Sequence, residues 1–142
     1  MSARVLLIGY GNPGRMDDGL GPAFAEAFEG KRIPGVMVDA DYQLTVEDAA
    51  DIAANDVAVF ADAAVVGPEP FFFRPVEPAA ELGFSTHSVE PEAVMALACE
   101  LFGAKTKGYV LGIKGYTFNE FGEGLSAGAM KNLATALEVM EP

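Results

Sequence analysis

Short apolar runs alternate with helix-like segments along this chain. Two of the runs, residues 5–8 and 57–61, are continuous and contain strong β-formers, a pattern typical of buried strands of a sheet. Shorter or later runs at 36–38 and 109–113 indicate further strands. Three consecutive phenylalanines at 71–73 indicate one more strand, expected at a sheet edge or in the core, although they would equally suit an exposed docking patch.

Helical patterns fill most of the segments between these runs. Pro22 suits the first turn of a helix that reaches about residue 28. Thr45 and Asp48 resemble a capping box, which predicts a second helix to about residue 54. From Pro91, apolar residues recur at helical spacing until Gly103, where a helix is expected to end. The last predicted helix covers 126–140, with Met130, Leu133, Ala134 and Leu137 on its apolar face.

This alternation of strands and helices predicts the fold class. Strand–helix–strand units form parallel sheets with helices on both faces. We therefore expect an α/β protein, a three-layer α/β/α sandwich with a mostly parallel, twisted sheet. Its 142 residues suit a single domain covering 1–142.

Charge and composition narrow the classes of partner. The net charge of −12 argues against nucleic acid, whose phosphates require basic surfaces. No apolar run is long enough to cross a bilayer, so no membrane association is expected. A single cysteine, Cys99, excludes an internal disulfide and favours a reducing compartment. We expect a cytoplasmic monomer, with Cys99 as a small core residue of its helix rather than a nucleophile paired with His87.

Acidic residues follow the first three predicted strands. Asp17 and Asp18 come after the first strand, Asp39 ends the second and Asp62 ends the third. In parallel sheets the carboxyl ends of the strands lie on one side, where ligands bind. The sequence therefore gathers carboxylates at the place where a site is expected.

A glycine fingerprint after the first strand offers a competing interpretation. Gly9, Gly11 and Gly14 form the G-x-G-x-x-G pattern of dinucleotide-binding proteins. Asp17 and Asp18, however, would place negative charge beside the phosphates, and the helix begins too late for Gly14 to pack against its start. A nucleotide-binding domain is therefore kept as an alternative.

The segment from Gly11 to Gly21 is similar to the signature of a known family. Gly11-Asn12, then Asp17-Asp18-Gly19 and Gly21, resembles the N-terminal motif of the hydrogenase maturation proteases. Later segments agree in order with that family: 42–44, 60–63, 86–88 and 122–126. The resemblance covers nearly the whole chain.

The resemblance implies an activity and a set of residues. Family members are metal-dependent endopeptidases that remove the C-terminal extension of a nickel-loaded [NiFe] hydrogenase large-subunit precursor. By position, the metal ligands and catalytic residues would be Asp18, Asp62 and His87, with Asp39 as a further catalytic acid. The nickel would be that of the precursor, so that it is sensed as part of the substrate.

The residue types fit this implication. Two carboxylates and one imidazole suit a divalent transition metal, and three protein ligands leave positions open for water or a substrate group. His87 is the only histidine, so any imidazole chemistry must use it. Asp17 is expected to orient its loop or to support the ligands. A module that binds the precursor without cleaving it remains a third interpretation.

Overall fold

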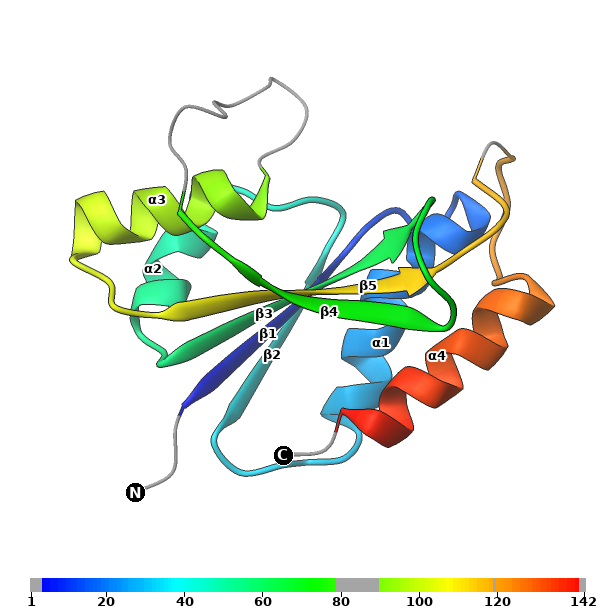
Figure 1. Ribbon diagram of the computed structural model, residues 1–142, viewed down its shortest axis with the longest axis horizontal. Coiled ribbons are helices and arrows are strands. Elements are labelled where there is room, and N and C mark those ends of the chain that lie inside the picture. Colours follow the sequence, from blue (N-terminus) through cyan, green and yellow to red (C-terminus); the bar gives the residue numbers. More distant parts are fainter. Residues whose placement is uncertain (1–3, 79–89, 119, 141–142) are drawn as a thin grey trace.

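The computed structural model describes residues 4–78, 90–118 and 120–140, and within them a five-stranded sheet lies between two pairs of helices (Figure 1). Helices α2 and α3 cover one face, and α1 and α4 cover the other. This confirms the predicted α/β sandwich. The elements are β1 (Val5–Tyr10), a 3₁₀ helix (Met16–Gly19), α1 (Leu20–Glu29), β2 (Val36–Asp41), α2 (Asp48–Ala53), β3 (Val57–Ala64), β4 (Phe71–Val76), α3 (Pro91–Phe102), β5 (Lys107–Lys114) and α4 (Ala127–Val139).

The strand order is β2-β1-β3-β5-β4. Four strands are parallel, and β4 pairs with β5 in the antiparallel sense at one edge. Pro75 lies in β4, where the missing N–H is tolerated because an edge strand has one unpaired side. The predicted strand at 71–73 is therefore an edge strand, and of its phenylalanines only Phe73 is exposed.

Alternating side chains of the strands build a separate core on each face of the sheet. Leu6, Ile8 and Phe60 pack toward α2 and α3, while Leu7 and Leu111 pack toward α1 and α4. A parallel sheet covered on both faces requires this arrangement, and it explains why its strands read as continuous apolar runs.

Local signals set the ends of the helices. Asp48 accepts a hydrogen bond from the Thr45 N–H at 2.9 Å, as expected of a capping box. Pro91 opens α3, and Gly103 closes it in the left-handed conformation at φ 64°. Ser126 caps α4 by accepting a hydrogen bond from the Ala129 N–H at 3.2 Å.

The apolar face predicted for α4 is correct in part. Leu133 and Leu137 pack against the core, but Met130 is 58% exposed, and the fully buried residues are Ala129, Asn132 and Ala136. Small side chains let the helix approach the sheet closely, and the Asn132 amide donates to the Lys114 carbonyl at 3.0 Å.

The order of the strands reverses at β1. From β1 the chain first forms β2 on one side and then β3 on the other. Ligands of open α/β sheets bind outside the carboxyl ends of the strands at such a switch point. Among the helices that the structure describes, none is long and apolar enough to cross a membrane.

Candidate functional site

A pocket of about 230 Å³ lies at the carboxyl ends of the strands, beside the start of α3. Asp62, near the end of β3, lines it together with Tyr10 at the end of β1. The parallel register pairs Gly9 with Ala61, which places the next residues, Tyr10 and Asp62, side by side. The other residues lining the pocket include Glu90, Glu92, Arg74, Phe72, Val110 and Gly112.

The Asp62 carboxyl lies in an unfavourable environment for its charge. Burial is the main cause that raises its pKa, to about 7, and the nearby charges of Asp18 and Glu90 add to this effect. The N–H of Ala63 donates to its Oδ1 at 2.8 Å, and hydrogen bonding from the Tyr10 phenol also favours the charged form. A cation would relieve the repulsion between these carboxylates.

Tyr10 remains a proton donor in this setting. Burial raises the pKa of its phenol, and the charges of Asp62 and Glu90 raise it further. The phenol therefore stays protonated and orients the Asp62 carboxylate.

Asp18 reaches the same region from the loop after β1. It lies in the 3₁₀ helix, and its Oδ2 accepts a hydrogen bond from the Asn12 N–H at 2.8 Å. That bond fixes the side chain across the turn. Its charge acts on Asp62, as the pKa of that residue shows. Of the three predicted ligands, Asp18 and Asp62 are thus near enough for the charge of one to raise the pKa of the other.

Asp17 fixes the loop that carries Asp18. Its carboxylate is fully buried, and it accepts hydrogen bonds from the N–H groups of Tyr116 (2.7 Å), Thr117 (3.0 Å) and Ser126 (2.7 Å) and from the Ser126 hydroxyl (2.7 Å). Burial alone would raise its pKa, but these hydrogen bonds outweigh burial and hold the pKa below its usual value. Asp17 therefore orients the loop, one of the two roles expected for it.

The glycine-rich segment before α4 is fastened to the same loop. The Gly122 N–H donates to the Gly14 carbonyl at 2.8 Å, and the Met16 N–H donates to the Gly122 carbonyl at 3.0 Å. Arg15 stacks over the Phe121 ring at 5.6 Å. Segments from both halves of the chain thus define the position of Asp18.

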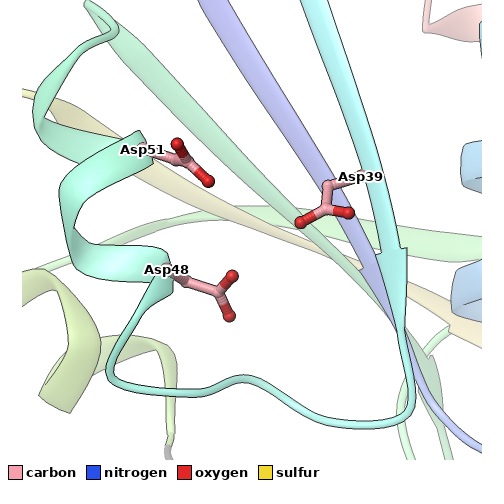
Figure 2. Close-up of side chains that lie close together, drawn as sticks. All are labelled: Asp39, Asp48 and Asp51. Atoms are coloured by element: carbon pink, nitrogen blue, oxygen red, sulfur yellow. The ribbon is translucent and has the colours of Figure 1, made fainter.

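Asp39 occupies a different place. It lies on β2, and β1 separates it from β3, which carries Asp62. Its carboxylate instead faces those of Asp48 and Asp51 on α2, and the three lie close together (Figure 2). Burial, together with the charges of Asp39, Asp41 and Asp51, raises the pKa of Asp48, while the Thr45 N–H opposes the shift.

His87, the third predicted ligand, lies outside the described residues, as does the rest of its 86–88 motif. Glu90 lies directly before α3, and Glu90 and Glu92 line the pocket that holds Asp62. Cys99 is partly buried in the third turn of α3.

Sequence reasoning did not identify Tyr10, Glu90 and Arg74 as residues of this pocket. The clue for Tyr10 was its position at the end of a buried strand, one residue before the turn. Glu90 was detectable as the residue before a helix-starting proline. Arg74 gave no sequence signal.

The glycines of the fingerprint have structural roles here. A Cβ on Gly9 would lie 2.1 Å from the Gly21 carbonyl oxygen, so glycine lets α1 pack onto the end of β1. Gly11 has φ +144°, a conformation that favours glycine. The Asn12 N–H already binds Asp18, and α1 starts only at Leu20. This geometry does not favour the nucleotide-binding alternative.

Comparison with known proteins gives a consistent result at the level of structure. No protein-family model and no curated protein sequence matches the chain. The crystal structure of the [NiFe] hydrogenase maturation protease HycI from Thermococcus kodakarensis superposes with a TM-score of 0.75 and 25% identity, covering 97% of this chain and 90% of that one.

Two further maturation enzymes are similar in fold. The hydrogenase maturating endopeptidase HybD from E. coli has a TM-score of 0.69 at 23% identity, over 95% of this chain and 88% of its own. A hydrogenase 3 maturation protease has a TM-score of 0.71 at 21% identity, over 99% and 90%. The chain therefore has the fold of the [NiFe] hydrogenase maturation proteases, the family that its ordered sequence motifs resemble.

Proposed function

We propose that this protein is an endopeptidase that removes the C-terminal extension of a nickel-loaded [NiFe] hydrogenase large-subunit precursor. The observation that supports the proposal is the half-buried Asp62 at the switch point of a maturation protease fold, with Asp18 near enough for its charge to add to the raised pKa of Asp62. A cation beside Asp62 would favour its charged form. We further propose that the protein acts as a monomer in the cytoplasm.

Asp18, Asp62 and His87 are proposed to coordinate the nickel of the precursor. On this proposal the metal belongs to the substrate, and cleavage waits until the metal has been inserted. Two carboxylates and an imidazole leave coordination positions open, so nickel could keep its precursor ligands while it is bound. A metal held there would polarise the scissile carbonyl or activate water.

The chain's own residues prepare Asp62 for this role. The Ala63 N–H and the Tyr10 phenol orient its carboxylate. Asp17 fixes the loop that presents Asp18. Asp39 is proposed to help only through its charge, because β1 lies between it and Asp62.

Cleavage of purified precursor tests the proposal. Nickel-loaded and nickel-free large-subunit precursors would be incubated with wild type and with Asp18→Asn, Asp62→Asn and His87→Ala, and the released peptide would be identified by mass spectrometry. We expect one nickel-dependent cleavage that each variant abolishes. Glu26→Gln, an exposed acid of α1 on the other face of the sheet, is the control and should cleave normally.

Two results would contradict the proposal. A folded wild type that leaves nickel-loaded precursor intact would not be a maturation protease. Nickel-dependent binding without cleavage would instead indicate a precursor-binding module. Circular dichroism of each variant separates a lost ligand from a lost fold.

A further inference from the structure

The pocket that holds Asp62 continues across the sheet to the edge strand β4. Its floor beyond Asp62 is apolar and is built from Val110, Gly112 and Phe72. A Cβ on Gly112 would lie 2.3 Å from the Phe72 ring, so only glycine lets this ring lie flat on β5. Val65 and Val66 line the same pocket and are 62% and 78% exposed. The result is a shallow apolar path that leads from Asp62 toward β4.

Arg74 stands at the far end of this path. Among the described residues that line the pocket, it is the only cation, and the acids that line the pocket with it are Asp62, Glu90 and Glu92. Its guanidinium stacks over the Phe72 ring at 5.9 Å from the centroid. Stacking of this kind leaves the guanidinium N–H groups free to bind in the plane of the ring system.

Within the protein, Arg74 forms a weak ion pair. Its Nη2 lies 4.0 Å from Oε2 of Glu92, the outer limit of an ion pair, and the Arg74 side chain is 52% exposed. Exposed pairs of this kind contribute little to stability and exchange readily with other partners. The arginine is thus held in place by stacking while its charge remains available.

We propose that Arg74 forms a subsite that binds a carboxylate of the substrate's C-terminal extension. The identity of the substrate rests on the function proposed above. With the precursor's nickel beside Asp18 and Asp62, the departing segment would cross the apolar floor toward β4. A guanidinium binds a carboxylate through two parallel hydrogen bonds, which a lysine does not reproduce. The Glu92 carboxylate pairs with the Arg74 guanidinium until the substrate carboxylate replaces it.

Steady-state cleavage of nickel-loaded precursor tests the subsite. We expect Arg74→Ala to raise KM about tenfold, the loss of one charge-assisted interaction, with kcat within about twofold of wild type. The KM of Arg74→Lys should lie between those of wild type and Arg74→Ala, and Arg74→Glu should raise KM further. Arg4→Ala removes an exposed arginine from the opposite ends of the strands and should leave KM unchanged.

Glu92→Gln gives the reciprocal test, since it removes the carboxylate that competes with the substrate for Arg74. We expect it to lower KM about two- to threefold, as freeing a weakly paired guanidinium predicts. If Glu92→Gln raises KM as Arg74→Ala does, the ion pair is structural and the subsite is refuted. Equal kinetics of Arg74→Ala and Arg4→Ala would refute it as well.

Peptide binding decides the question independently of cleavage. A fluorescein-labelled synthetic peptide with the sequence of the extension would be titrated with wild type and Arg74→Ala, and anisotropy recorded. Amidation of its C-terminus, or replacement of each acidic residue by its amide, distinguishes a terminal carboxylate from a side chain. One of these changes should weaken binding to wild type about tenfold and leave binding to Arg74→Ala unaltered. If no modification of the peptide weakens binding in this way, the subsite is refuted, even where the precursor is cleaved. If one modification does so while the precursor stays intact, only the proposed protease function is refuted.

Discussion

The charge of Asp62 is expected to lower the stability of the metal-free protein, and Asp62→Asn measures by how much. Asparagine keeps the shape of the side chain and can still accept the hydrogen bond from the Ala63 N–H. It removes the negative charge that burial, Asp18 and Glu90 make unfavourable. The variant should therefore be inactive but more stable than wild type at alkaline pH.

The direction of the pH dependence follows from the pKa of Asp62. Its pKa is about 7 in the folded protein, against 3.8 for an unperturbed aspartate. Between these values the folded protein binds more protons than the unfolded chain, so the free energy of unfolding falls as pH rises. The difference between these two pKa values corresponds to roughly 4 kcal/mol, and partial solvent screening reduces the expected destabilisation to about 2 kcal/mol at pH 8.

Urea unfolding followed by circular dichroism, with a chelator present, gives the measurement. Asp62→Asn should unfold at higher urea concentration than wild type at pH 8, and the difference should shrink toward pH 5. Glu26→Gln, which changes an exposed acid, should show no such trend. A pH-independent difference, or an Asp62→Asn variant less stable than wild type at pH 8, would refute the reasoning.

Three further predictions concern the residues around the site. Asp17→Asn should lower the free energy of unfolding at pH 7 by about 3 kcal/mol in urea titrations, because buried N–H donors lose a charged acceptor. Since the pKa of Asp17 is lowered by folding, its contribution is present above the unfolded pKa near 4 and lost as pH falls below it, so wild type and variant should converge in acid. Gly112→Ala should lower the free energy of unfolding by about 1–3 kcal/mol and lower the Tm in scanning calorimetry, because the Phe72 ring must move away from β5. An unchanged Tm would contradict this packing. Tyr10→Phe removes a hydrogen bond that favours the charged carboxylate, so the pKa of Asp62 should rise above about 7 in carbon-13 NMR titrations, and a fall would exclude the bond.

Much of the fold was accessible from the sequence because β1 and β3 lie inside the parallel sheet and are mostly buried. Continuous apolar runs marked β1, β2 and β3, and Pro91 and Gly103 marked both ends of α3. The face of α4 was not accessible in the same way. Its contact with the sheet depends on small residues and on the polar Asn132, which hydropathy does not assign to a core.

The site was only partly predictable, for a geometric reason. Periodicity shows that an acid follows a strand, but it does not give the lateral order of the strands. The charge of Asp18 acts on Asp62 because β1 and β3 are neighbours, whereas Asp39 lies on the far side of β1. Arg74 enters the pocket only because β4 turns back antiparallel to β5, which no local motif encodes.

The hydrogen bonds of Asp17 also have a consequence for biosynthesis. They join a motif near the start of the chain to partners 99 to 109 residues further on. Contacts of such separation form late, after the costly closure of a long loop. While ribosomes are still translating the segment before α4, the loop that carries Asp18 lacks the donors that shape it. A nascent chain would thus lack the ordered loop that carries Asp18 until Ser126 has emerged.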